Sequence, residues 1–355
     1  MLVLMKLKLN DRKVCCVSDI HIGVHQNSQM WHDITVEWAG WLSRELDKHG
    51  VTDILIPGDL FHYRDEIAVN TIHVTTQILN MWKRFNIVIL VGNHDAYYKD
   101  KSDINSLSIL SGWDNITVVS QPTQYECFNR KLMFCPWGTE PEQIMESDIV
   151  FGHFEIQSFR FNQHKVCEDG IKSESILSKT PLVITGHFHL REERVYKNGK
   201  ILYLGNPYQM DFGDVNGIKG YYLLDIVTGD YDFYVNDISP THQKIKLSEL
   251  VAHGSLTDEV REMFANNIVK LIIDRQVAPD DMDLLLKKYI ELNAKSITAD
   301  YDITFNKFGL EDENDHDLSG VDVTIAIEEF INMLEDVDDK QQIIDYTVDL
   351  YRKYK

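Results

Sequence analysis

The chain has 355 residues, of which 44% are hydrophobic and 26% are charged, and its formal net charge at pH 7 is −21. This length accommodates one large domain and one or two small modules. The longest apolar runs are only as long as a strand, so we expect no transmembrane helix. The five cysteines are scattered and form no CxxC motif, which favours a reduced, cytoplasmic setting.

The acidic excess is concentrated near the end of the chain. Residues 311–339 contain 12 Asp or Glu and neither Lys nor Arg, whereas the remainder has 44 acidic and 35 basic residues, a net charge of −9. Because the remainder is still acidic, we do not expect it to bind nucleic acid strongly without help.

The first two hundred residues alternate short apolar runs with helical patterns. Helical spacing of apolar residues occurs over residues 31–49 and 69–85. The apolar runs lie at residues 14–17, 54–57, 87–91, 149–151 and 182–185. Continuous runs of this length are typical of strands that are buried on both faces. The alternation predicts an α/β fold with at least partly parallel sheets.

Each of these five runs is followed by polar residues that can bind a metal ion, in most cases just after a glycine. The collected residues are Asp19, His21, Asp59, His62, Asn93, His94, Asp95, His153, His187 and His189. Since ligand sites of α/β folds lie beyond the carboxyl ends of the strands, we expect these side chains to converge on one crevice.

The residue types point to divalent metal ions. Imidazole and carboxylate groups together suit manganese, zinc or iron. Seven ligands are too many for one tetrahedral ion but suit two ions that share a bridging carboxylate, for which we choose Asp59. The seven are Asp19, His21, Asp59, Asn93, His153, His187 and His189. Such a site attracts a phosphodiester even on an acidic protein and supports its hydrolysis by water.

The catalytic residues are expected beside these ligands. His94 follows the ligand Asn93 and can protonate the leaving oxygen as a general acid. Asp95 can orient His94 or serve another role behind the ligands. We expect the other histidines to be structural or solvated, namely His25, His32, His49, His73, His164, His242, His253 and His316.

The five motifs together resemble the calcineurin-like metallophosphoesterase signature. They read Asp19-x-His21, Gly58-Asp59-x-x-His62, Gly92-Asn93-His94-Asp95, Gly152-His153 and Gly186-His187-x-His189. The Gly-Asp-Leu-Phe-His form of the second motif and the segment 205–209 resemble the SbcD-type recombination nucleases within that superfamily. The size and the acidic tail are most similar to the T-even bacteriophage members, and the resemblance is firmest over residues 1–215.

This resemblance implies a sandwich of two mixed β-sheets flanked by helices, with a small α/β capping domain and C-terminal helices. It implies one manganese ion held by Asp19, His21, Asp59 and His189, and another held by Asp59, Asn93, His153 and His187. His94 would be the general acid, and His62 would lie close to the leaving strand. The implied activity is manganese-dependent exonuclease action on DNA ends and endonuclease action on single strands, in the host cytoplasm for a phage-encoded chain.

The resemblance also implies partners. Members of the family often form homodimers through helices, for which residues 69–85 and 102–113 are candidates here, although both can equally pack on their own sheet. Two amphipathic segments within residues 323–355 favour docking on the coiled coil of an SMC-like ATPase, with docking on their own domain as the alternative. The chain has no P-loop, so ATP hydrolysis would need a separate subunit.

We therefore predict four parts. A metallophosphoesterase nuclease domain spans residues 1–237, a capping domain 238–305, a linker 306–322, and an ATPase-binding helical segment 323–355. Within the capping domain we expect helices at 256–265 and 282–292 and strands at 268–273 and 297–305. Two other functions remain open: a small-molecule phosphodiesterase, and a non-catalytic scaffold subunit that metals only stabilise.

Overall fold

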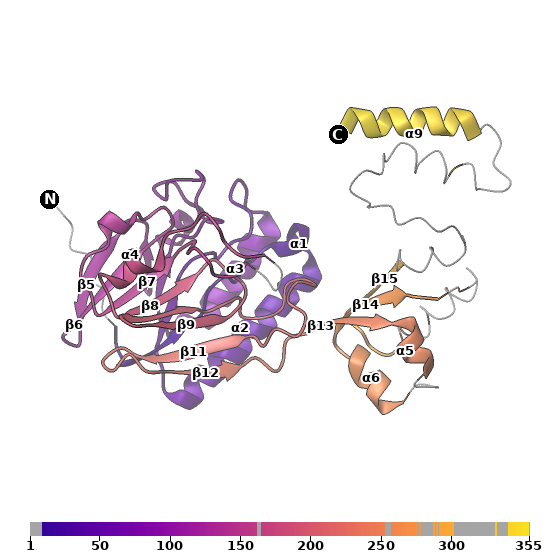
Figure 1. Ribbon diagram of the computed structural model, residues 1–355. Helices are drawn as coiled ribbons and strands as arrows, with labels where there is room; N and C mark the ends of the chain where they lie inside the picture. The colour runs from indigo at the N-terminus through magenta and orange to yellow at the C-terminus, as the bar shows by residue number, and fades with distance from the viewer. Residues whose placement is uncertain are drawn as a thin grey trace. The chain divides into compact units, whose positions relative to one another are not determined.

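The computed structural model describes residues 9–161, 165–252, 257–275, 277, 287, 289, 291–301, 331 and 340–354 (Figure 1). The chain divides into two compact units, residues 1–302 and 303–355, which are described separately. The first unit contains the five predicted strands and three β-sheets. None of the described helices is long and apolar enough to cross a membrane.

Two six-stranded mixed sheets form the sandwich. The first has the order β12-β11-β1-β2-β3-β4, with β1 (Lys13–Cys16), β2 (Asp53–Ile56), β3 (Asn86–Leu90), β4 (Ile116–Val119), β11 (Gly220–Asp225) and β12 (Tyr231–Val235). The second has the order β5-β6-β7-β8-β10-β9, with β5 (Thr123–Cys127), β6 (Arg130–Cys135), β7 (Ile149–His153), β8 (Leu182–Gly186), β9 (Glu192–Tyr196) and β10 (Gly199–Tyr203). In each sheet the central strands are parallel.

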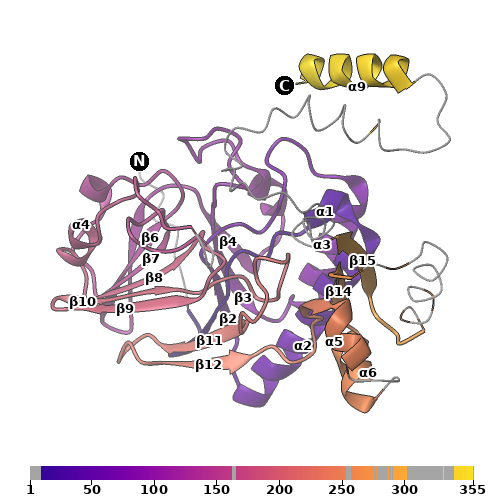
Figure 2. The same cartoon turned by 45° about the vertical axis from the view of Figure 1, so that its right-hand side comes forward.

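Three apolar layers hold the sandwich together. Figure 2 shows the ribbons of the two sheets and of the helices that flank them. Helices α2 (Gln29–His49) and α3 (Val69–Met81) bury Trp38 and Ile78 against the outer side of the first sheet. Between the sheets, Leu55 and Val88 share one cluster with Phe134 and Phe151. A third cluster covers the outer side of the second sheet, where α4 (Ser173–Leu177) packs. Because strands in both sheets are covered on two sides, their sequences are continuously apolar rather than alternating.

A small α/β region follows the sandwich. Its parallel three-stranded sheet has the order β13-β14-β15, formed by β13 (His242–Lys246), β14 (Ile268–Ile273) and β15 (Ser296–Tyr301). Helices α5 (Leu247–Ala252) and α6 (Asp258–Phe264) bury Leu250 and Phe264 against it. The second unit is described mainly by α9 (Lys340–Tyr354), in which Ile344 and Val348 cluster with Ile331.

The predicted fold class is confirmed, with two corrections to the helices. Helix α3 ends at Met81 rather than at residue 85, because Trp82 is buried and donates from its ring to the Ala39 carbonyl as the chain turns towards β3. The region 102–113 contains only a 3-10 helix, Ser106–Leu110, since Ser102 and Asn105 bond to backbone carbonyls instead of continuing a helix. The predicted linker and most of residues 323–339 lie outside the described residues, and the four domain bounds stay a prediction.

The short elements complete the sandwich. They are α1 (Val24–Asn27), the 3-10 helix just named and a second 3-10 helix, Pro141–Gln143. The β11–β12 hairpin closes across Thr228-Gly229-Asp230, where Gly229 has a φ of 78°.

Candidate metal centre

The sequence-predicted site residues lie at the carboxyl ends of β1, β2, β3, β7 and β8, so both sheets contribute. The backbone there is unusual, because Asp19, His21, Asp59 and His187 have φ values of 56°, 51°, 55° and 92°. Non-glycine residues rarely adopt this left-handed region, which costs about 1–3 kcal/mol each where it persists. The fold therefore holds these four residues in a backbone conformation that their local sequence does not favour.

Two glycines leave the space in which the ligands meet. Gly58 has a φ of 104°, and a Cβ on it would lie 2.2 Å from Nδ1 of His153. A Cβ on Gly92 would lie 2.1 Å from Oδ1 of Asp59. Larger residues at either position would displace a candidate ligand, which explains the glycine before the polar residue in these motifs.

The first group of candidate ligands is Asp19, His21 and His189, whose ligand atoms lie within 4.8 Å of one another. Nε2 of His21 and Nε2 of His189 are 2.9 Å apart. The Asp19 carboxylate also accepts from the backbone N–H of His187 at 3.0 Å. One aspartate thus belongs to the first group and holds the backbone of a residue in the second.

The second group is Asp59, His153 and His187, with Asn93 between the two rings. Oδ1 of Asn93 is 2.8 Å from Nε2 of His153 and 2.9 Å from Nδ1 of His187. Nδ1 of His153 donates to the carbonyl of Pro57 at 2.7 Å, which leaves Nε2 facing the centre. A partner on the far ring nitrogen is the usual way in which proteins orient a ligating histidine.

Asp59 lies between the two groups. Its Oδ2 is 3.7 Å from Nε2 of His21 and 3.3 Å from Nε2 of His153. Its Oδ1 accepts from the backbone N–H of His94 at 2.8 Å. This placement agrees with the bridging role expected of Asp59, because the side chain reaches both groups with one carboxylate.

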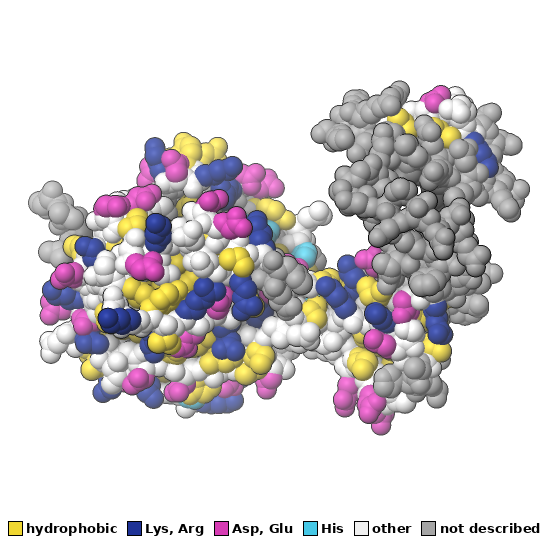
Figure 3. Space-filling view, in the orientation of Figure 1, with side chains coloured by type: hydrophobic (Ala, Val, Ile, Leu, Met, Phe, Trp, Pro, Cys, Tyr) yellow, Lys and Arg dark blue, Asp and Glu magenta, His cyan; other side chains and the backbone are white. Residues whose placement is uncertain are grey.

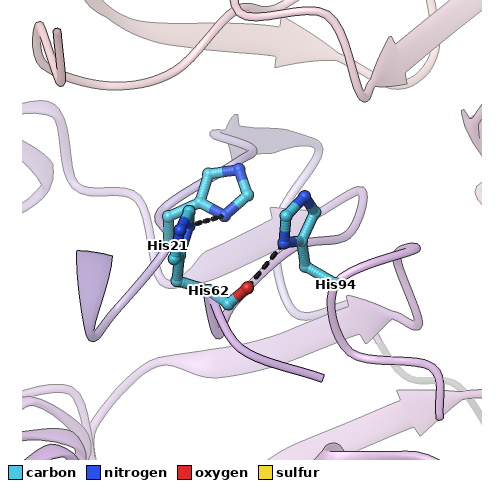
Figure 4. Close-up of side chains that lie close together, drawn as sticks. All are labelled: His21, His62 and His94. Atoms are coloured by element: carbon cyan, nitrogen blue, oxygen red, sulfur yellow. Dashed lines mark hydrogen bonds between the residues drawn. The ribbon is translucent and has the colours of Figure 1, made fainter. Parts of the chain in front are cut away.

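His94 and His62 lie beside the first group (Figure 4). Nδ1 of His94 is 2.5 Å from the carbonyl oxygen of His62. A carbonyl can only accept, so Nδ1 of His94 carries the hydrogen and its Nε2 is left for proton exchange. The Nδ1 atoms of His62 and His21 are 3.3 Å apart, so the His62 ring also positions the candidate ligand His21.

Asp95 does not reach the ligand groups directly. Its buried carboxylate accepts from the backbone N–H groups of Phe61 and Gly92 at 3.0 Å and of Leu60 at 3.3 Å. It therefore ties the loop after β2 to the loop after β3, which is a positioning role. Burial and the charge of Asp59 raise the pKa of Asp95 to about 7.

The electrostatics favour the neutral imidazole at His21, His62 and His187. Burial, reinforced by neighbouring imidazoles, lowers the pKa of His187 to about 3 and that of His62 to about 4. His153 is the exception: burial opposes its protonation, but Asp59 and Asp19 raise its pKa to about 9. Burial would raise the pKa of Asp59, yet His153 and His21 hold it well below its usual value. Neutral imidazole and ionised carboxylate are the forms that bind divalent metals.

Two features behind the ligands were missed by sequence reasoning. The buried amine of Lys219 donates to the His189 carbonyl at 2.8 Å and to Oδ1 of Asp214 at 2.6 Å, and it also contacts Oδ1 of Asn206. The ring of Trp137 lies 5.0 Å from that of His187. The lysine and the tryptophan stand in no recognisable motif, so the sequence offered no signal for them.

The donor set fits two divalent ions, since two carboxylates, one amide oxygen and four imidazoles converge without a competing Lys or Arg among the described residues at the centre. The family profile of calcineurin-like phosphoesterases matches residues 12–191, which contain all ten predicted site residues. The chain therefore belongs to the calcineurin-like phosphoesterase family.

Among individual proteins, the chain is similar to exonuclease subunit 1 of Enterobacteria phage T4. The two are 24% identical over 357 residues, which cover 96% of this chain and 98% of the phage protein. One solved structure that aligns with this chain is an archaeal phosphodiesterase, with 14% identity, coverage of 63% of this chain and 99% of that one, and a TM-score of 0.37. Another is a Thermus thermophilus protein, with 12% identity, coverage of 63% of this chain and 98% of that one, and a TM-score of 0.38. A dimetal phosphatase from Danio rerio aligns over 60% of this chain and 92% of its own (8%, TM-score 0.39).

Proposed function

We propose that this chain is a manganese-dependent DNA exonuclease and endonuclease, which hydrolyses phosphodiester bonds during double-strand-break processing and recombination. The observation that carries the proposal is the position of Asp59 between two groups of metal-binding side chains. The likeness to the phage exonuclease subunit along nearly the whole chain supports DNA as the substrate.

The metal roles follow the two groups. Asp19, His21, Asp59 and His189 would hold one ion, and Asp59, Asn93, His153 and His187 would hold the other. When bound, the two ions activate a water molecule and neutralise charge on the phosphate. They would also give the site a positive charge. On the face seen in Figure 3, Lys and Arg are interspersed with Asp and Glu.

His94 is the general acid of the proposed reaction. The His62 carbonyl fixes its ring, and the backbone contact to Asp59 fixes its main chain. Its Nε2 then delivers a proton to the leaving oxygen, a contribution of about 10²–10⁴-fold in rate. His62 lies beside the same path, and Asp95 keeps both loops in place.

We also propose two protein partners, an SMC-like ATPase and a second copy of this chain. An SMC-like ATPase binds residues 323–355, and helix α9 supplies an amphipathic surface for a coiled coil. A homodimer forms through α3, on which Val69 and Ile72 are 84% and 43% exposed. Such exposed apolar side chains are typical of interaction surfaces.

An end-labelled duplex with manganese tests the activity. We expect cleavage that EDTA abolishes, and a His94→Ser variant that binds manganese normally but cleaves about 10²–10⁴-fold more slowly. Cleavage of a small chromogenic phosphodiester but not of DNA would favour the small-molecule enzyme. Full activity of His94→Ser with metals bound would refute the acid assignment, and a metal-loaded wild type without any hydrolysis would favour the scaffold.

Deletion of residues 323–355 tests the partner. The purified SMC-like ATPase should no longer co-elute with the truncated chain in size-exclusion chromatography. The melting transition of residues 1–302 should remain. Loss of that transition would instead show that the tail docks on its own domain.

A further inference from the structure

The loop that follows the His94 motif displays aromatic side chains to solvent. Tyr97 and Tyr98 are 53% and 45% exposed, and Ile104 on the same loop is 54% exposed. The two tyrosine rings lie edge to face with their centroids 5.0 Å apart. Large apolar groups on a surface are costly when they gather, so a cluster of three on one short loop indicates a binding surface.

The loop is held in place by hydrogen bonds at its base. The Tyr97 N–H donates to the Ile104 carbonyl at 3.0 Å, and Ala96 forms an antiparallel bridge with Asn105. The Trp137 ring donates to the Lys99 carbonyl at 2.7 Å. The rings are therefore presented by a fixed loop, and ordering them costs little when a ligand binds.

The position of the loop limits what can bind there. Tyr97 is three residues from His94, so their Cα atoms are at most about 11 Å apart. The Ser106 N–H donates to the carbonyl of Asp95, which also joins the far end of the loop to the catalytic segment. A molecule bound on these rings is therefore held close to the segment that carries His94, the proposed general acid.

The charges on the loop indicate which part of a nucleic acid it contacts. Lys99 and Lys101 alternate with Asp100 and Asp103, and all four are exposed. Their charges cancel, so the loop offers little attraction for the phosphate backbone. Aromatic rings, by contrast, stack on unpaired bases of any sequence.

On the basis of the proposed function, we propose that Tyr97 and Tyr98 form a stacking platform for unpaired bases of a single strand, on the loop that follows the His94 motif. The platform binds bases that are already single-stranded or that fray from a duplex end. It accounts for attachment of DNA to a chain with a formal net charge of −21. Ile104 extends the apolar contact at the edge of the platform.

Direct binding tests the platform without cleavage. We would measure the anisotropy of a fluorescein-labelled oligo-dT strand with the full chain in EDTA. The Tyr97→Ala, Tyr98→Ala double variant should bind about tenfold more weakly or worse, the loss expected when one stacked base is released. The Tyr97→Phe, Tyr98→Phe variant keeps both ring faces and should bind as the wild type does.

Two further variants separate stacking from other causes. Tyr97→Leu with Tyr98→Leu keeps the apolar surface but removes the rings, so it should bind as weakly as the alanine variant; wild-type affinity would overturn the stacking proposal. Phe128→Ala is the matched control, because Phe128 is 41% exposed in the β5–β6 turn, at the end of the sheet opposite to the metal ligands. Its affinity for oligo-dT should not change.

The outcomes distinguish this inference from the proposed function. A wild type that binds oligo-dT through these tyrosines but does not cleave DNA with manganese would refute the nuclease and keep the platform. Cleavage by the wild type together with unchanged binding by the alanine variant would refute the platform and keep the nuclease. The platform is also overturned if the wild type does not bind oligo-dT in EDTA. The same holds if the alanine variant only changes from dimer to monomer in sedimentation.

Discussion

Strand β2 has a buried aspartate at each end, and the two differ in their partners rather than in burial. Asp53, at the amino end, is 0% exposed, and Asp59, just beyond the carboxyl end, is 1% exposed. Asp53 accepts from the backbone N–H groups of Asn10 and Asp11 and from the Asn86 amide. Asp59 accepts one backbone N–H and otherwise faces imidazole rings.

The two aspartates differ in the chemistry of the groups around them. Hydrogen-bond donors around Asp53 satisfy its charge permanently, so the group joins the N-terminal segment to β2 and β3. Around Asp59 the neighbouring groups are ring nitrogens that can ligate metals, so its carboxylate faces groups that suit a shared cation. Burial of an acid therefore predicts function only together with the chemistry of its partners.

Replacing Asp59 should have the largest effect on activity. Asp59→Asn removes the charge that both metal groups share, and we expect a loss on the order of 10³-fold in kcat for manganese-dependent DNA cleavage. Manganese content, measured by elemental analysis after gel filtration, should fall from two ions towards one or none. Near-normal cleavage by this variant would show that Asp59 is not the bridge.

Removing Lys219 should have the second-largest effect, because Lys219 supports the candidate ligand His189. Lys219→Met leaves Asp214 buried without its partner, which should cost about 3–5 kcal/mol in the free energy of unfolding. Because the amine also holds the His189 carbonyl, manganese affinity should fall by about 10–100-fold. Urea denaturation and isothermal titration calorimetry measure the two effects.

A double variant separates these two consequences of losing Lys219. Lys219→Met with Asp214→Asn removes the unpaired charge and should recover much of the stability, while the loss in metal affinity persists. Recovery of both would show that the lysine serves stability alone.

Sequence reasoning located the meeting place of Asp19, Asp59 and His187, because these polar residues closely follow apolar runs that form strands. Their identities as metal ligands stay a prediction. The same reasoning failed for Lys219 and Trp137, because they approach the site from segments that carry no repeated pattern. It also overestimated helix in residues 102–113, where side chains of Ser102 and Asn105 compete for backbone groups.

The left-handed backbone at the ligands was also beyond sequence reasoning. Nothing in the residue types of Asp19 or His21 requires a positive φ, which results from packing two sheets against the same loops. Propensity describes what a segment does alone, whereas this conformation is imposed by tertiary contacts.

Asp95 is an intermediate case, a buried acid at the carboxyl edge whose carboxylate accepts backbone N–H groups. Asp95→Asn should weaken the bonds to the backbone of Phe61 and Gly92, and so loosen the loops that carry Asp59 and His94. We expect a loss of about 10–100-fold in kcat/KM, as for other groups that orient ligands. The manganese stoichiometry should remain two, and a variant that loses an ion would instead make Asp95 part of the ligand set.

Replacing Asp53 should leave catalysis intact and thereby complete the comparison with Asp59. Asp53→Asn keeps one acceptor oxygen but removes the charged carboxylate that accepts hydrogen bonds from Asn10, Asp11 and Asn86. The free energy of unfolding should therefore fall by about 1.5–3 kcal/mol. Cleavage per folded molecule and manganese content should match the wild type, since the residue lies at the opposite end of β2 from the ligands. A large fall in kcat without a fall in stability would mean that the two ends of the strand are coupled, and that partner chemistry alone does not separate the two aspartates.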